Sequence, residues 1–203
     1  IATFGHLMIV RAYDHAEAAA DKGALFKTFM KVLAQRKGLM ATFMAKWSGK
    51  YPGQSGHIHV SLRDKATDKS AFYDPSQPHN MSALQRHFLA GQQRLMPELL
   101  CMVAPTLNSY RRMIPGFWAP TDATWGVENR TAALRVIPGG DKSQRLEYRL
   151  GAADGNPYLA LSVALGSGLY GVMQKWEPTD PVVGNGYAVK HPEQLALPRT
   201  LWD

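Results

Sequence analysis

The feature that most constrains the fold is residues 130–149, where two short apolar or β-branched segments flank a Pro-Gly-Gly-Asp turn. This pattern predicts two antiparallel strands joined by a loop. Because side chains alternate between the two faces of a strand, Arg145, Glu147 and Arg149 share one face. If the hairpin closes symmetrically about its turn, Arg135 lies opposite Glu147. One face would then carry three arginines around a single carboxylate.

This charged face indicates a site for an anionic ligand and a metal ion. Charges that leave water without a partner lose much of their solvation free energy, so a buried cluster of this kind needs a balancing ligand. Planar arginine side chains bind phosphate and carboxylate groups well, and magnesium bridges carboxylate and phosphate oxygens. The pattern alone fits equally an exposed ladder of salt bridges on an edge hairpin.

A second candidate segment is the alternating run at residues 57–61, which follows an expected strand at 39–47 and an expected loop at 48–56. Alternation places the side chains of His57, His59 and Ser61 on one face. The two imidazoles would lie about 7 Å apart, so that one could bind a metal while the other donates to a phosphate. The same spacing also occurs in strands without such a role.

Composition limits the classes of protein to which the chain can belong. Its 203 residues are 45% hydrophobic and 19% charged, which is typical of one globular domain. The net charge of +7 favours anionic partners, but it does not choose between a nucleotide, a nucleic acid and an acidic metabolite. No basic run with interleaved aromatic residues is present, so we expect no nucleic-acid partner.

Cysteine usage and hydropathy suggest where the protein works. Cys101 is the single cysteine and has no disulfide partner, which favours a reducing, cytoplasmic compartment. The first residues do not resemble a signal peptide. The longest apolar stretch, residues 157–173, is interrupted by serines and glycines and predicts a buried helix. We therefore expect no membrane partner.

Several helices are expected from apolar spacing and capping residues. Residues 14–38 form an amphipathic pattern that ends at a glycine. Ser82 is a suitable N-cap for a helix through residue 96, and Pro97 would open a second helix to residue 103. Asn156 followed by proline predicts the start of the helix at 158–173.

Residues 108–120 combine a short basic helical segment, a Pro-Gly turn and a Phe-Trp-Ala-Pro loop. This arrangement is suited to holding a carboxylate beside a mobile flap. It fits equally an exposed basic turn with an aromatic anchor.

Taken together and in order, six segments resemble the catalytic domain of the glutamine synthetase family. They are ATFMAK at 41–46, SGHIHVSL at 55–62, NSYRRMIPG at 108–116, WGVENRTAALR at 125–135, RLEYR at 145–149 and NPYLA at 156–160. The resemblance runs from about residue 19 to the end. It implies an α+β fold in which a curved antiparallel sheet holds the site and helices pack outside. Residues 1–203 would be a single, incomplete catalytic domain, without the family's N-terminal β-grasp domain and C-terminal helices, and we expect no activity from this piece by itself.

The resemblance assigns one group of residues to a metal ion and to ATP. His57 and Glu147 would bind Mg²⁺ or Mn²⁺ beneath the nucleotide phosphates. The expected contacts with ATP are the polar side chains of His59, Ser61, Arg135, Lys142 and Arg145.

A second group would act on glutamate and on the transferring phosphate. Arg112 and Arg149 would hold glutamate carboxylates, while Arg130 and Arg135 would hold the phosphate. The family's reaction activates the side-chain carboxylate of glutamate as a γ-glutamyl phosphate, which an amine then displaces. The resemblance thus implies an ATP-dependent ligase that joins ammonia or an organic amine to the γ-carboxylate of glutamate. Family members work as homo-oligomeric rings in which a neighbouring subunit completes each site.

Three departures from the family pattern bear on this expectation. The flap carries Trp118 where the family usually has a glutamate that binds ammonium, so we expect an organic amine such as a polyamine. A metal-binding glutamate of the family would fall near Met8, in a stretch that matches poorly. The family's earlier strand, which carries further metal-binding carboxylates, has no match in these residues either. The lack of these carboxylates favours an alternative, a catalytically inactive family member that serves as a structural or nucleotide-binding subunit.

Overall fold

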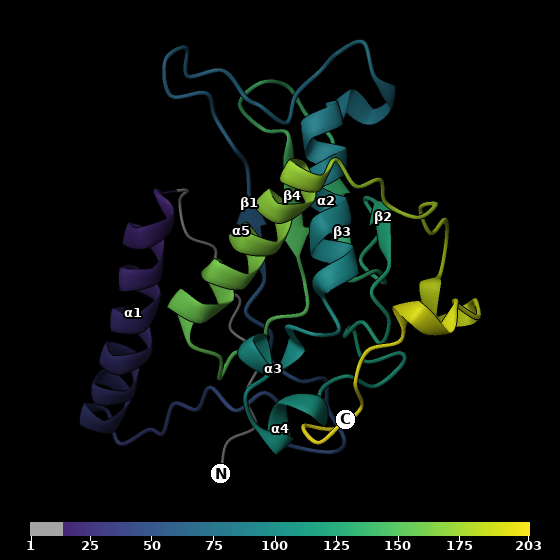
Figure 1. The fold of residues 1–203 in the computed structure, drawn as a ribbon. Coiled ribbons are helices and arrows are strands. Elements are labelled where there is room, and N and C mark those ends of the chain that lie inside the picture. Colours follow the sequence, from purple (N-terminus) through teal and green to yellow (C-terminus); the bar gives the residue numbers. More distant parts are fainter. Residues whose placement is uncertain (1–13) are drawn as a thin grey trace.

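The computed structural model describes residues 14–203, so the position near Met8 lies outside the described residues. Its centre is a four-stranded sheet in the order β1-β4-β3-β2 (Figure 1). The strands are β1 (Ile58–Val60), β2 (Trp125–Val127), β3 (Leu134–Ile137) and β4 (Arg145–Tyr148).

The hairpin of β3 and β4 has the predicted register. Arg135 pairs with Glu147, and β1 joins the other edge of β4 in antiparallel fashion, with His59 also opposite Glu147. The symmetric closure inferred from the sequence is therefore confirmed. It places side chains from three strands around one carboxylate.

The sheet is mixed, whereas a wholly antiparallel sheet was expected, because β2 pairs with β3 in parallel. Residues 128–133 return the chain to the start of β2, and Glu128 begins this return with a φ of 51°. Parallel neighbours usually need a connection of about a dozen residues or more. The short spacing between β2 and β3 therefore gave no sign of parallel pairing.

The main helices are α1 (Ala16–Arg36), α2 (Ala83–Leu95) and α5 (Pro157–Gln174), with short helices α3 (Leu100–Val103) and α4 (Leu107–Tyr110). The side chain of Ser82 caps α2, and that of Asn156 caps α5, as predicted. The helix expected from Pro97 begins only at Leu100. Short 3₁₀ segments are η1 (Pro78–Asn80), η2 (Gly186–Ala188) and η3 (Glu193–Leu195).

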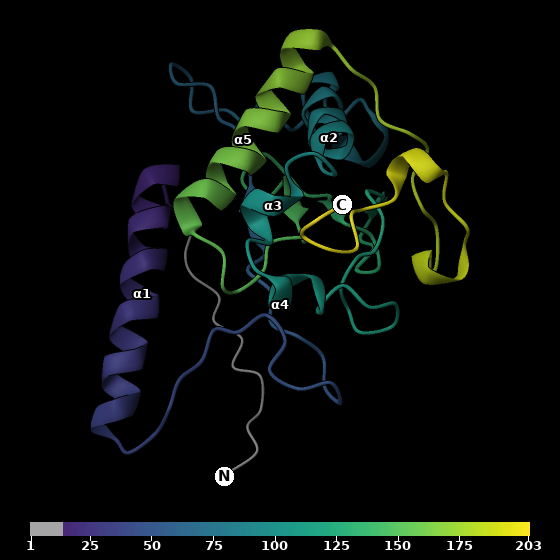
Figure 2. The same ribbon diagram turned by 60° about the horizontal axis from the view of Figure 1, so that its bottom comes forward.

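The apolar core lies between the sheet and the α2–α5 pair. Leu146 and Tyr148 of β4 are buried, in one cluster with Phe88 of α2 and Val163 of α5. The α2 and α5 helices lie side by side in both views (Figures 1 and 2). Since neighbouring residues of a strand point to opposite faces, this packing turns Glu147 away from the helices.

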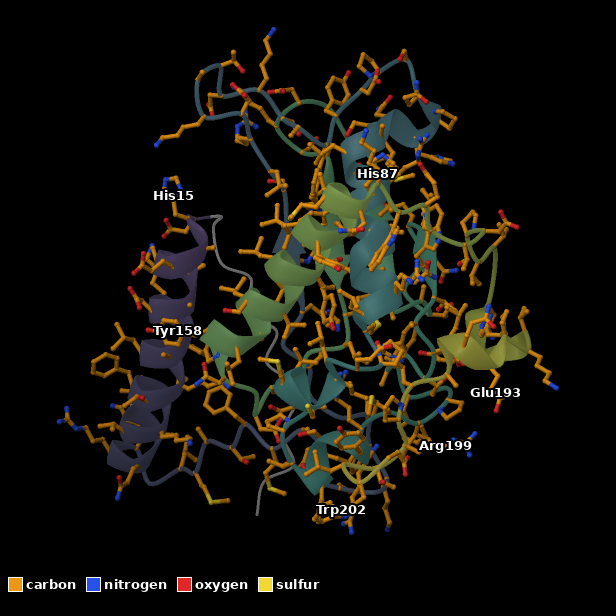
Figure 3. All side chains as sticks on the ribbon, in the orientation of Figure 1. His15, His87, Tyr158, Glu193, Arg199 and Trp202 are labelled. Atoms are coloured by element: carbon orange, nitrogen blue, oxygen red, sulfur yellow. The ribbon has the colours of Figure 1, made fainter. Side chains whose placement is uncertain are left out.

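Helix α1 lies outside α5 and contacts it through its N-terminal half (Figure 2). Tyr158, labelled in Figure 3, donates a hydrogen bond to Asp21 of α1. Farther along α1, Leu25 is 53% and Phe29 63% exposed, so much of the predicted apolar face is uncovered in the described part of the chain. No described helix combines the length and hydropathy needed to cross a bilayer.

The strand predicted at residues 39–47 is wrong. This segment is irregular, and it pairs with no strand of the described chain. The main chain of Lys46 is held instead by the side chain of Asn108. A strand-like sequence without a strand beside it has no ladder of hydrogen bonds to join.

The contact between α2 and α5 depends on glycines, which makes it testable. A Cβ added at Gly91 would lie 2.2 Å from the carbonyl oxygen of Ser167, whereas one at Gly166 would meet no atom within 4 Å. We expect Gly91→Ala to lower the free energy of unfolding by about 2 kcal/mol. Gly166→Ala should raise it by about 0.5 kcal/mol because alanine favours the helix. Urea unfolding followed by circular dichroism measures both, and equal effects would contradict this packing.

Candidate active site

The centre of the candidate site is the Glu147 carboxylate on β4, whose side chain is 4% exposed. Arg149 donates from Nη1 to Oε1 at 2.8 Å, and Arg135 donates from Nη1 to Oε2 at 3.1 Å. Two guanidinium groups from adjacent strands thus share one carboxylate. Of the three arginines predicted around this carboxylate, Arg135 and Arg149 contact it, whereas Arg145 contacts His59 instead.

Burial and charge act in opposite directions on Glu147. Burial alone would raise the pKa of its carboxyl group, but the hydrogen bond with His57 and the charges of Arg149 and Arg135 outweigh it and hold the pKa well below the ordinary value. Burial lowers the pKa of His57, more than the contact with Glu147 raises it. A negative carboxylate therefore faces a neutral imidazole near pH 7.

His57 and Glu147 form a hydrogen bond, and they are also close enough together to bind one metal ion. His57 Nδ1 lies 3.0 Å from Glu147 Oε1. Two adjacent ligands in an octahedral magnesium shell, with bonds of about 2.1 Å, lie about 3.0 Å apart. Within residues 14–203, no group of three or more His, Cys, Asp or Glu side chains converges as a metal site would. The pair fits a shell completed by water and phosphate oxygens, which magnesium commonly keeps.

Arg112, which follows α4, is 2% exposed. One Nη2 hydrogen bond goes to the carbonyl of Leu150, and Nε has no hydrogen-bond partner in the described residues. Burial, and then the neighbouring charge of Arg149, lowers the pKa of Arg112 to about 10. No carboxylate pairs with Arg112 in the described part of the chain.

Arg149 adds a second buried guanidinium beside Arg112. Its side chain is 5% exposed, and its Nε also lacks a hydrogen-bond partner among the residues described. Leaving a buried donor of this kind unmet is unfavourable by about 1–3 kcal/mol, more for a charged group. Two such donors on neighbouring arginines are chemically suited to an anion with several oxygens.

The site continues outward along β1 and β4 towards solvent. His59 Nε2 lies 3.9 Å from Glu147 Oε1, and Arg145 Nε lies 3.3 Å from His59 Nδ1. Ser61 is exposed just beyond β1. Lys142 is exposed in the turn between β3 and β4.

Two expected site residues stand apart from the cluster. Arg130 is exposed in the return between β2 and β3, and no described carboxylate pairs with it. Trp118 is 60% exposed and has a φ of 61°, a conformation that is rare for a bulky residue. Both project into solvent, where they can meet a ligand.

One residue at the site was not assigned a role from the sequence. Glu128 accepts hydrogen bonds from Nε and Nη2 of Arg135. It reaches this arginine because β2 lies parallel to β3, which the sequence did not indicate. Arg135 is therefore fixed between Glu128, which is 51% exposed, and the buried Glu147.

The sequence profile described as "Glutamine synthetase, catalytic domain" matches residues 7–203. The chain is 44% identical over 191 residues to type-1 glutamine synthetase 2 of Dictyostelium discoideum, covering 93% of this chain and 36% of that protein. It is 42% identical over 186 residues to glutamate–isopropylamine ligase of a Pseudomonas species, covering 92% and 40%.

A third relative is gamma-glutamylethanolamide synthetase GlnA4 of Streptomyces coelicolor, 41% identical over 202 residues, which cover 98% of this chain and 42% of that protein. Among solved structures, "Apo GmaS without ligand" superposes with a TM-score of 0.81 at 32% identity, covering 92% of this chain and 42% of that one. The chain thus spans about two fifths of the length of these relatives.

The lowered pKa of Glu147 predicts how stability depends on pH. Because the folded-state pKa lies below the unfolded value, the carboxylate stabilises the fold above about pH 4.5, and this contribution is lost as the pH falls towards the folded pKa. Glu147→Gln should lower the free energy of unfolding by about 3 kcal/mol at pH 7, since it leaves the buried Arg149 without a carboxylate and Arg135 with Glu128 alone. The difference in the free energy of unfolding between Glu147→Gln and the parent protein should become smaller below about pH 4.5.

Urea unfolding between pH 7 and pH 3 measures this difference. Glu98→Gln, at an exposed glutamate of the α2–α3 connection, serves as the control and should leave stability unchanged at both ends of the range. An equal deficit of Glu147→Gln at pH 7 and pH 3 would show that the carboxylate is not held ionised by its neighbours.

Proposed function

The chain belongs to the glutamine synthetase family, and on that premise we propose that the protein joins an amine to the γ-carboxylate of glutamate with the use of ATP. The observation that carries this proposal is Arg112, a buried guanidinium that forms no ion pair with a described carboxylate and is influenced by Asp154 only through its charge. It adjoins Arg149, which leaves a second Nε free. A substrate with two carboxylates supplies the missing negative charge and the missing acceptors.

Each end of the cluster then has its own task. Arg112 and Arg149 bind and orient glutamate carboxylates. Arg135 is held by Glu128 and Glu147, so its guanidinium stays at the edge of the buried cluster. There it stabilises the negative charge that develops on the oxygens of the transferring phosphate. Arg130 is exposed nearby along the chain and adds to this positive charge.

The nucleotide would lie over the outer part of the sheet. His59, Ser61, Lys142 and Arg145 present polar or cationic side chains there, suited to the phosphates of ATP. His57 and Glu147 would hold Mg²⁺ or Mn²⁺, which neutralises phosphate charge when bound. The spacing of this pair supports the assignment.

In the proposed reaction, a γ-carboxylate oxygen of glutamate attacks the γ-phosphorus of ATP, and the bond to ADP breaks. The nitrogen of the amine then attacks the γ-carbonyl carbon, inorganic phosphate leaves, and the nitrogen loses a proton. The arginines hold the reacting groups close together and balance their charge, which is what such a transfer chiefly requires.

We further propose that the amine is organic. Trp118 occupies the flap with an exposed aromatic ring, which favours a cation that carries apolar groups. The names of two relatives, an isopropylamine ligase and a gamma-glutamylethanolamide synthetase, are consistent with this choice.

We also propose an oligomeric state and a cellular compartment for the protein. We place this chain in a catalytic domain that works in a homo-oligomeric ring, because the apolar residues Leu25, Phe29, Leu33, Leu39 and Met40 are exposed in the described chain and suit an interface. The single cysteine supports the cytoplasm as the compartment.

Phosphate release tests the proposed activity directly. The full-length protein, assembled into the oligomer that completes each site, is incubated with ATP, Mg²⁺ and L-glutamate and with a panel of amines from ammonium to diamines. We expect release that requires both glutamate and an amine. Binding of ATP without any glutamate-dependent release would contradict the ligase and support the alternative, a nucleotide-binding subunit.

Replacement of Arg112 separates binding from folding. Arg112→Met should raise the KM for glutamate by about a hundredfold, because a charge-assisted contact is lost, and leave the KM for ATP unchanged. Stability should stay equal or rise by up to about 1 kcal/mol, since a buried unbalanced charge is removed. Arg111→Met, at the exposed neighbour, is the matched control and should change neither value. A large loss of stability in Arg112→Met would mark Arg112 as structural.

Replacement of Trp118 tests the choice of amine. Trp118→Glu places an anion on the flap, so the ratio of kcat/KM for ammonium to that for an organic amine should rise by about tenfold. Trp202→Glu introduces the same change at an exposed tryptophan near the C-terminus and should leave the ratio unchanged. An unaltered ratio in Trp118→Glu would show that the flap does not select the amine.

A further inference from the structure

Lys46 is a buried lysine without a carboxylate. The residue is 6% exposed, and no described acidic side chain forms an ion pair with it. Its Nζ donates to the carbonyl of Tyr51 at 2.6 Å and lies 4.2 Å from the centroid of the Phe117 ring. One ammonium group therefore contacts two loops that are far apart in the sequence.

The main chain of Lys46 is fixed as firmly as its side chain. Its N–H donates to Oδ1 of Asn108 at 2.9 Å, and its carbonyl accepts from Nδ2 of the same side chain at 2.7 Å. Asn108 belongs to α4, the helix that leads into Arg112. The position of Lys46 is thereby set by the element that carries the unbalanced arginine.

The first loop, residues 48–56, covers Arg112. At Gly53 an added Cβ would lie 2.5 Å from Cγ of Arg112, so the loop main chain touches the arginine stem. The hydrogen bond from Lys46 to Tyr51 holds this loop two residues before Gly53.

The second loop, residues 114–119, carries Trp118. Gly116 and Trp118 both have positive φ values, of 80° and 61°, which for tryptophan is an uncommon conformation. Phe117 lies between them and presents its ring to the ammonium of Lys46. A cation held over a ring away from water stabilises such a turn.

We infer that Lys46 is a positioning residue, which ties the loop over Arg112 to the turn that carries Trp118, so that both loops become ordered together. One consequence rests on the proposed function. Residues 48–56 would then cover the glutamate carboxylate and residues 114–119 would contact the amine, so that order in one loop depends on order in the other. Lys46 itself touches neither substrate in this arrangement.

Hydrogen exchange tests whether Lys46 links the two loops, and it does not depend on enzymatic activity. In Lys46→Met the amides of residues 48–56 and of 114–119 should both exchange about tenfold faster, because a hydrogen bond from a charged donor and a cation–π contact are lost. Lys50→Met removes an exposed lysine from the first loop and should change neither segment. Faster exchange in one segment alone, or in neither, would overturn the inference.

If Lys46→Met is less stable, its amides will exchange faster throughout the chain. A second variant then shows whether the two loops are linked. Phe117→Leu removes only the ring. We expect faster exchange in residues 48–56 as well as in 114–119, although residue 117 lies in the second loop. Faster exchange confined to residues 114–119 would contradict a link between the two loops.

Kinetics test the consequence for the substrate. Lys46→Met should raise the KM for glutamate about tenfold without changing the KM for ATP, and Lys46→Arg should restore part of it. Equal changes in both KM values would contradict a positioning role. If the parent protein releases no glutamate-dependent phosphate, the proposed function fails, while the exchange result still decides whether Lys46 ties the loops.

Discussion

The structure depends on the balance of charge around Glu147. One buried carboxylate pairs with both Arg135 and Arg149 and contacts His57, so a single acidic side chain holds the centre of the charged face together. The opposite face of the same strand packs Leu146 and Tyr148 into the core. The alternation of β4 therefore joins the stability of the fold to the geometry of the site. Arg112 forms no ion pair in the described chain and leaves its Nε without a hydrogen-bond partner, which is why we propose that a substrate carboxylate binds it.

The parts that sequence reasoning predicted are those governed by local rules. Alternation along residues 130–149 and a symmetric turn were enough to pair Arg135 with Glu147, and capping chemistry located the starts of α2 and α5 at Ser82 and Asn156. The roles of the site residues came from the family resemblance. These roles stay predictions; the structure shows that the arginines are buried and that His57 contacts Glu147.

The parts that sequence reasoning missed depend on contacts between distant segments. The parallel pairing of β2 with β3 brings Glu128 to Arg135, and no local sequence pattern predicts this pairing. Residues 39–47 have the composition of a strand but no strand beside them in the described chain. The role of Lys46 is visible only when the loops at Tyr51 and Phe117 are seen on either side of one ammonium group.

Nitrogen NMR of the arginine side chains tests the central claim most directly, since Arg112 and Arg149 each leave an Nε–H without a partner in the described chain. The Nε resonances are assigned through single arginine replacements and followed while L-glutamate is added, with L-lysine as the control titrant. We predict that both resonances shift in a saturable way with glutamate alone. Resonances that stay unchanged at saturating glutamate, or that shift equally with lysine, would contradict the account of a buried cationic site for glutamate.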